Sequence, residues 1–390
     1  MLQKPPSVRA VVVPGAAAMA MAMGVGRFGF TPILPLMQDQ AGLAPDQGAQ
    51  LATANYLGYL LGAVLALVRP ATTTSAPAFR AALVAQVVAL ATMATTTSVP
   101  VWALARWCSG VVSALVFIAV AGAVAARLSC RGSSRGGWVY GGIGGGIAVS
   151  GVLVLVLESA GTWTTAWWAC ATTAAALGAV AWTLPVSHPR APAPTRASET
   201  GPGSSARPRP GTRDSFVALV VSYFLEGTGY IIAGTFLVAA IRATTPGWVG
   251  SSAWVLVGLA ALPSAAVYAR LARTFPPATV LRTALLVQSV GMLLPAVFTG
   301  SGAALLAGVI FGGTFLGIVS LGMGTGARMG VPRSGAILTI AFSLGQILGP
   351  LVAAPLIRHG YAPALVLGAI VVALAAVPTV LIRLAAPPTR

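Results

Sequence analysis

The sequence predicts an all-α integral membrane protein with twelve transmembrane helices, arranged as two six-helix halves. Composition is the first reason, because 57% of the residues are hydrophobic, 7% are charged and the mean hydropathy is +0.88. A water-soluble core of this size needs far less apolar surface. The second and third reasons are the regular spacing of apolar segments and the alternation of arginines between them.

Twelve apolar segments are long enough to cross a hydrocarbon core of about 30 Å as helices. Polar residues, Pro and Gly, or arginines separate them. Their approximate limits are 10–36, 48–68, 79–97, 101–127, 136–158, 162–184, 215–241, 247–269, 279–298, 302–325, 335–357 and 361–383. Lys4 and Arg9 precede the first segment, which is too long for the apolar region of a cleavable signal peptide and is therefore predicted to be a span.

The basic residues determine the predicted topology. With the N-terminus inside, nineteen of the 23 lie in cytoplasmic gaps or ends, Arg242 and Arg358 lie outside, and Arg27 and Arg106 lie within spans. Such alternation follows the positive-inside rule and places both ends in the cytoplasm. The net charge of +17 is therefore read as a topology signal and not as a nucleic-acid interface. The Ala-rich, Arg-for-Lys usage indicates a bacterial source, hence the inner membrane.

One long polar gap divides the chain. Residues 185–214 are rich in Pro, Gly, Ser and Arg and contain almost no large apolar residue, so they are predicted to form a flexible cytoplasmic linker. The linker separates residues 1–184 from residues 215–390. Its five arginines could also contact lipid headgroups, although a solvated tether is the simpler interpretation. We expect a monomer surrounded by membrane lipids.

The two halves contain a weak internal repeat. Three matches occur in the same order at nearly constant separations of 203, 201 and 199 residues, which predicts two halves in the same orientation, related by an axis along the membrane normal. The matches are 24–27 with 227–230, 126–128 with 327–329, and 146–151 with 345–350.

Three segments extend this pattern to a known family: GVGRFGFTPILPLMQ (24–38), LATANYLGYLLGA (51–63) and YFLEGTGYIIAGTF (223–236). Together they resemble the major facilitator superfamily, in a branch of uncharacterised bacterial transporters. The resemblance implies secondary active transport by alternating access, with the substrate held near the midplane between the halves. It also departs from the superfamily, because the loop at 69–80 lacks the acidic residue that normally helps to lock the inner gate.

Four ionisable residues are candidates for membrane depth: Arg27, Arg106, Glu158 and Glu226. Glu226 is the only charge in the apolar segment 216–241, and an acid at that depth costs about 2.5 kcal/mol or more unless it faces protein or water. Glu158 ends its span near the outside, where it can reach water. Arg106 lies near the outer end of its span and could extend toward the interface, although superfamily members often have an arginine of this span facing the central cavity.

Arg27 and Glu226 form the predicted proton-coupling site. The repeat aligns Arg27 with Tyr230, one helical turn after Glu226. The two charges could therefore meet, or share a water-filled cavity, across the axis between the halves. Our hypothesis is a charge pair that breaks and re-forms during the cycle, with Glu226 accepting the proton. The alternative is a static pair that only orients the halves.

Polar and aromatic residues at helical spacing outline the predicted substrate site. Individually, most such residues join neighbouring helices by hydrogen bonds, but as a set they outline a cavity with few charges, many aromatic groups and one acid. Such a cavity suits an apolar or amphipathic organic molecule. The predicted substrate-binding residues are Arg27, Asn55, Tyr56, Tyr59, Arg106, Tyr223, Glu226, Tyr230, Ser343 and Gln346, and Thr339 shares a face with the last two.

Two further segments receive structural interpretations. The glycine-rich stretch 140–151 has neither a preceding strand nor a following Lys-Ser/Thr, so it predicts close helix packing and not a phosphate loop. It resembles a motif of drug exporters that contains proline, which is absent from this segment, so efflux and import both stay open. Pro32 and Pro35 are expected to bend or end the first span near its outer end.

Other functions find less support in the sequence. Cys108, Cys130 and Cys170 match no metal or redox spacing, and His188 and His359 lie beside loop Pro or Gly residues, so no metal site, cofactor or catalytic group is predicted. The alternatives are a uniporter in which Glu226 binds the substrate and, less favoured, a membrane-embedded lipid-modifying enzyme. The enzyme lacks a recognisable nucleophile or metal cluster at either membrane face. A sensor would be expected to have a sizeable soluble domain.

Overall fold

The computed structural model describes residues 9–128, 135–157, 161–186, 212–245, 248–331, 334–358 and 360–383. Every regular element in these ranges is helical, which confirms the predicted all-α fold class. Glu158, Cys130, both histidines and most of the predicted linker lie outside the described residues.

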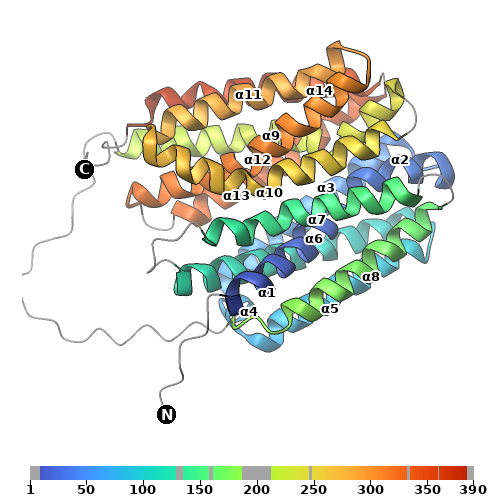
Figure 1. Cartoon of the computed structure of the whole chain (residues 1–390), viewed down its shortest axis with the longest axis horizontal. Helices are drawn as coiled ribbons and strands as arrows, with labels where there is room; N and C mark the ends of the chain where they lie inside the picture. Colours follow the sequence, from blue (N-terminus) through green and yellow to red (C-terminus); the bar gives the residue numbers. More distant parts are fainter. Residues whose placement is uncertain are drawn as a thin grey trace, which may run out of the picture.

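The helices from α1 to α8 make up the first half of the molecule (Figure 1). Their bounds are α1 Arg9–Met19, the π-helix η1 Ala20–Val25, α2 Phe30–Ala41, α3 Pro45–Val68, α4 Ala71–Thr74, α5 Ala76–Ala94, α6 Val99–Leu128, α7 Arg135–Leu157 and α8 Trp163–Ala181. The second half contains α9 Thr212–Thr244, α10 Val249–Thr274, α11 Pro277–Val297, α12 Ser301–Arg328, α13 Ser334–Ile357, α14 Tyr361–Ala376 and the 3-10 helix η3 Pro378–Leu381.

A helix occupies each of the twelve predicted positions. Eleven spans in the described ranges are long and apolar enough to cross a membrane, with the segment from α1 to α2 taken as one. The twelfth predicted position is filled by α8, a helix of 19 residues. Its sequence includes four threonines.

The first span is interrupted earlier than its prolines predict. After the π-helix η1, residues 26–29 form a turn, and α2 then begins at Phe30. Of the two expectations, that Pro32 and Pro35 bend the helix or end it, the second does not hold, because α2 continues to Ala41. Pro32 is the third residue of α2, where a backbone N–H has no partner within the helix and its loss costs little.

Helix packing repeats between the halves, which supports their relation by a pseudo-two-fold axis. In the first half α3 packs on α6, α5 on α8, and α1 with η1 on α7. The second half contains the equivalent pairs, α10 on α12, α11 on α14, and α9 on α13. The contacts between the halves are paired in the same way, since α3 packs against α13 and α7 against α10.

The glycine-rich helix α7 packs closely on both sides, as its sequence predicts. Gly142 and Gly146 lie against the backbone of Ala16 and Ala20 in the same half. Gly144 lies against the backbone of α10 in the other half, where an added Cβ atom would be 2.5 Å from the Leu262 nitrogen. Small residues therefore bring α7 into contact with a neighbour in each half.

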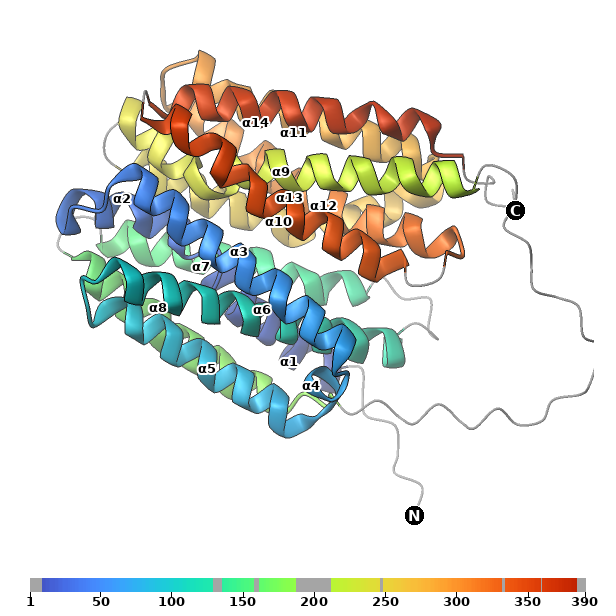
Figure 2. The same ribbon diagram turned by 180° about the vertical axis from the view of Figure 1, so that it is seen from behind.

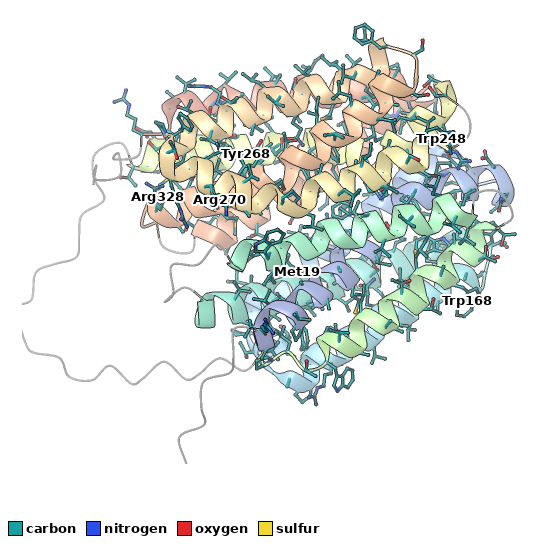
Figure 3. The ribbon with its side chains drawn as sticks, in the orientation of Figure 1. Met19, Trp168, Trp248, Tyr268, Arg270 and Arg328 are labelled. Carbon is teal, nitrogen blue, oxygen red and sulfur yellow. The ribbon has the colours of Figure 1, made fainter. Side chains whose placement is uncertain are left out.

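The two halves approach most closely at the end of the molecule where α2 lies and are more widely spaced at the end where α1 begins (Figures 1 and 2). At the closer end, the Gln38 side chain donates a hydrogen bond to the Tyr361 hydroxyl at 2.8 Å, and Arg358 lies 3.9 Å from Asp46. At the wider end lie Arg270 and Arg328, as Figure 3 shows. We call these ends the closed face and the arginine face.

Candidate functional site

A cavity of about 70 Å³ lies between the two halves. Its wall is mostly apolar, with Arg27 as the charged member and no acidic side chain among the described residues that line it. Organic ligands usually occupy pockets of about 300–1,000 Å³, so the cavity is constricted in this conformation. The aromatic residues of the wall come from both halves and are Phe28, Tyr59, Phe117, Tyr223, Tyr230, Phe315 and Phe342.

Arg27 connects the two halves at this cavity. It is buried, and its Nη2 donates a hydrogen bond of 2.6 Å to the amide oxygen of Gln346. The Gln346 amide nitrogen in turn donates to the Tyr230 hydroxyl, also at 2.6 Å. On the first-half side, the guanidinium carbon lies 4.3 Å from the ring centroid of Tyr59 and 4.9 Å from that of Tyr56. The guanidinium is therefore held by aromatic faces and a neutral amide.

Arg106 holds the backbone that presents Arg27. Its Nη1 and Nη2 donate to the carbonyl oxygens of Gly26 and Arg27, each at 3.1 Å, and its guanidinium packs over the Phe30 ring at 4.7 Å. The Asn55 side chain donates to the Arg106 carbonyl at 2.8 Å. Of the two alternatives for Arg106, extension toward the interface and an inward-facing position, its 1% exposed fraction agrees with the inward one. This arginine supports the turn at 26–29 and does not line the cavity.

Glycine is needed at the start of that turn. A Cβ atom added to Gly26 would lie 2.3 Å from the Gln86 amide nitrogen. That amide donates to the Ser109 hydroxyl at 2.8 Å, so a shift of Gln86 would disrupt a buried hydrogen bond. The turn thus packs tightly on its outer side and leaves Arg27 directed at the cavity.

Flat aromatic rings form the second-half wall. The Tyr230 ring stacks with Phe342 and Phe315, with centroid distances of 5.2 and 6.1 Å and interplanar angles of 22° and 8°. Phe28 of the first half meets Phe315 edge to face at 6.0 Å. The Tyr223 hydroxyl donates to the Val319 carbonyl, so this tyrosine also contributes mainly its ring to the cavity.

Hydrogen bonds between the halves close the cavity toward the closed face. Thr31 donates to the Gly234 carbonyl at 2.5 Å, and the hydroxyls of Tyr56 and Thr235 lie 2.9 Å apart. Thr31 follows Arg27 along the first span, and Gly234 and Thr235 follow Tyr230 along α9, in both cases in the direction of the closed face. Among the described residues, the side-chain hydrogen bonds between the halves therefore lie at the level of Arg27 or beyond it toward that face.

Glu226 lies outside this cavity. Its carboxyl group is buried beside the Gln288 amide of α11, without a hydrogen bond of normal geometry to it. Neither oxygen has a hydrogen-bond partner among the described residues. Glu226 precedes Tyr230 by four residues, which turns its side chain about 40° around α9 from Tyr230. The predicted ion pair with Arg27 is therefore absent from this structure, and Arg27 contacts Gln346 instead.

The repeat gives Gln288 an equivalent in the first half. Gln86 and Gln288 are 202 residues apart and occupy corresponding helices, α5 and α11. Gln86 is paired with the hydroxyls of Ser109 and Ser113, whereas both polar atoms of Gln288 lack a partner among the described residues. At the same offset of 202, Phe311 and Phe315 replace the two serines. The second half thus places the Gln288 amide beside the Glu226 carboxyl group, at the position where the first half has a glutamine hydrogen-bonded to two serine hydroxyls.

The predicted substrate residues separate into two groups. Arg27, Tyr59, Tyr223, Tyr230 and Gln346 line the cavity. The remaining predicted residues do not, and these are Asn55, Tyr56, Arg106, Glu226 and Ser343. The sequence reasoning missed the phenylalanines of the wall and Gln288. A glutamine in the middle of the apolar segment 279–298 was the available signal for Gln288.

Comparisons with known proteins agree with this architecture. The family model described as "Uncharacterised MFS-type transporter YbfB" matches residues 19–380. No curated protein shows a significant match. Among solved structures, the nucleoside transporter NupG is similar with a TM-score of 0.67 and 12% identity, covering 96% of this chain and 98% of that one. A mutant of NupG has a TM-score of 0.69 at 12% identity, covering 95% and 99%. The human organic anion transporter MFSD10 has a TM-score of 0.61 at 17% identity, covering 97% and 100%.

Proposed function

Because this chain belongs to the family of uncharacterised MFS-type transporters described as YbfB, we propose that it is a secondary active transporter working by alternating access. Its substrate is a small apolar or amphipathic organic molecule, and transport is coupled to protons through Glu226. The protein acts as a monomer in the bacterial inner membrane, with lipid around its exposed apolar surface and both chain ends in the cytoplasm.

One observation supports alternating access above all others. The cavity is lined by both halves, and in the part of the chain that the structure describes, hydrogen bonds between the halves close it toward the closed face. Separation of the halves at the closed face, with approach at the arginine face, would expose the same wall to the other side. The cavity must also widen from about 70 Å³ to accept an organic molecule.

The arginines support one direction of the protein in the membrane. Arg270 and Arg328 lie at the end where the halves are more widely spaced (Figure 3). Under the positive-inside rule that end is cytoplasmic, and the structure represents an inward-facing conformation. Cysteines introduced singly at Arg270 and at Trp248, near the opposite end, test this orientation. A membrane-impermeant thiol reagent applied to intact cells should label only the cysteine at 248.

Proton coupling is assigned to Glu226 because its carboxyl group has no hydrogen bond or ion pair, within the described ranges, that would stabilise a charge. An unpaired charge at bilayer depth is costly, and the cost disappears when the group is neutral. Proton uptake and release at Glu226 thus change the charge of the second half without requiring contact with the substrate. Substrate binding by Glu226 itself, as in the uniporter alternative, receives no support from a carboxyl group that lies outside the cavity wall.

Liposomes that contain the full chain test the proposal. With a pH gradient imposed and a pH-sensitive dye enclosed, candidate organic compounds should cause proton movement only when the protein is present. Glu226→Gln should abolish that movement and retain exchange of substrate for substrate across the membrane. If Glu226→Gln keeps full proton-coupled flux, the carrier role is wrong. If no compound crosses, the transport proposal fails. The sign of proton movement relative to substrate distinguishes efflux from import.

A further inference from the structure

We infer that the transported molecule is an organic monoanion, with one carboxylate or similar group bound by Arg27 and an apolar, preferably aromatic body against the rings of the second half. The inference names the substrate class of the transporter proposed above and rests on that function. It depends on the charge balance of the cavity, on which hydrogen-bond donors of Arg27 and Arg106 already have partners, and on the shape of the wall.

The charge balance of the cavity is positive. Arg27 lines it and is 3% exposed. Within the described residues, no carboxylate forms an ion pair with Arg27, and Glu226 lies outside the wall. A guanidinium removed from water and left without a counter-charge is unfavourable, and buried charges in proteins are almost always paired. A bound anion supplies the missing charge.

The present partners of Arg27 leave binding capacity free. Its Nη2 donates to a neutral amide oxygen, and its Nε has no hydrogen-bond partner among the described residues. The rings of Tyr56 and Tyr59 stabilise the cation through their faces but accept no full hydrogen bond from it. A guanidinium binds a carboxylate through two parallel hydrogen bonds, which neither an amide nor a ring provides. The Gln346 oxygen therefore occupies the position of an anion and can be displaced by one.

Arg106 does not add a second anion-binding group. Both of its terminal nitrogens donate to backbone carbonyls, and it is absent from the cavity wall. A single available guanidinium favours a monoanion over a dianion. Arg106 acts as a positioning residue, because it fixes the carbonyls of the turn from which Arg27 extends.

The rest of the wall selects the body of the molecule. Tyr230, Phe315 and Phe342 present nearly parallel rings, and the opposite side includes Phe28 and Tyr59. Flat apolar surfaces of this kind favour a flat or aromatic ligand through stacking and burial. The hydroxyl of Tyr230 already accepts from Gln346, so this tyrosine, Gln346 and Arg27 form one connected polar group in the wall.

Binding of three matched probes to the full chain in lipid nanodiscs tests the inference. The probes are 3-phenylpropanoate, its uncharged amide and 3-phenylpropylammonium, which share a body and differ in charge. We expect the anion to bind at least about tenfold more tightly than the amide and the ammonium to bind weakest. Equal binding of anion and amide, or no binding of any probe, would overturn the inference.

Variants separate a direct role from a structural one. Arg27→Gln should remove the preference for the anion, Arg27→Lys should restore part of it, and Arg270→Gln, at an exposed arginine, should leave it unchanged. Anion preference that survives in a folded Arg27→Gln protein contradicts the assignment. If Arg27→Gln fails to fold, the Lys variant decides, since its ammonium group keeps the charge but lacks the guanidinium fork, which predicts reduced but measurable selectivity. Binding of the anion without flux in liposomes would reject transport and keep the anion site. Flux of the amide without flux of the anion would support transport and reject the anion site.

Discussion

The guanidinium of Arg27 in the first half donates to the side-chain oxygen of Gln346 in the second half, 2.6 Å away. This bond joins α13 to the irregular first span at the wall of the central cavity. It takes the place of the ion pair with Glu226 that the repeat suggests. A neutral partner holds the arginine in place and can be exchanged for a charged one.

Gln346→Glu should replace that neutral partner with a permanent carboxylate. The new side chain is nearly isosteric and pairs with Arg27, so we expect a higher thermal unfolding temperature in detergent and at least about tenfold weaker binding of 3-phenylpropanoate. Gln346→Leu is the matched control, which should lower stability by about 1–3 kcal/mol because it removes a hydrogen bond to a buried charge. Undiminished probe binding by the Glu variant would contradict the exchange of partners.

Arg106→Lys should weaken the turn that presents Arg27. A lysine ammonium group cannot reach both carbonyls in the geometry of the guanidinium fork, so one buried carbonyl loses its partner. We expect a loss of about 1–3 kcal/mol in the free energy of unfolding, measured by denaturation in mild detergent. Arg273→Lys, at an exposed position of α10, should change it by less than about 0.5 kcal/mol. Similar effects at both sites would remove the special role of Arg106.

Adjacent glycines of α7 should respond in opposite ways to alanine. Gly144→Ala places a Cβ atom 2.5 Å from the Leu262 nitrogen and 2.7 Å from the Gly258 oxygen, both backbone atoms of α10. We expect a cost of about 1–3 kcal/mol from the forced separation of the two helices. Gly145 has no neighbour within 4 Å of such an atom, so Gly145→Ala should be neutral or stabilise by up to about 1 kcal/mol. Thermal unfolding of the two purified variants provides the comparison.

Glu226→Gln should not destabilise the protein at neutral pH. The native carboxyl group makes no hydrogen bond and no ion pair among the described residues, so the amide forfeits no interaction that the structure shows. Unfolding temperatures measured across a pH series should become less dependent on pH in the variant, because a buried titrating group is removed. A large drop in stability at neutral pH would show that the carboxylate has a structural partner in the folded protein.

The fold was accessible from the sequence because the bilayer imposes it. Apolar length and arginine alternation reflect the thickness and charge asymmetry of a membrane, and a helix is present at each of the twelve predicted positions. The division at residues 184 and 215 stays a prediction. The turn at 26–29 in the first span could not be predicted in this way, since it depends on tight packing against Gln86 and Arg106, both distant in sequence.

The site was accessible only in part. Helical spacing placed Tyr223, Tyr230 and Gln346 on inward faces, and all three line the cavity. The same spacing could not resolve the rotation of about 40° around α9, relative to Tyr230, that directs the Glu226 side chain away from the cavity. Phenylalanines of the wall gave no signal, because an apolar ring is equally compatible with lipid, core and cavity.

The uncompensated charge of Arg27 has an electrical consequence. An anion bound there lowers the charge of the central region by one unit, so the empty and the loaded protein differ in how the membrane potential acts on their conformational changes. One elementary charge that crosses the full field corresponds to about 2.3 kcal/mol per 100 mV. Voltage therefore affects the return of the empty carrier and the passage of the loaded one unequally, and the slower of these two steps determines how turnover depends on the energised state of the cell.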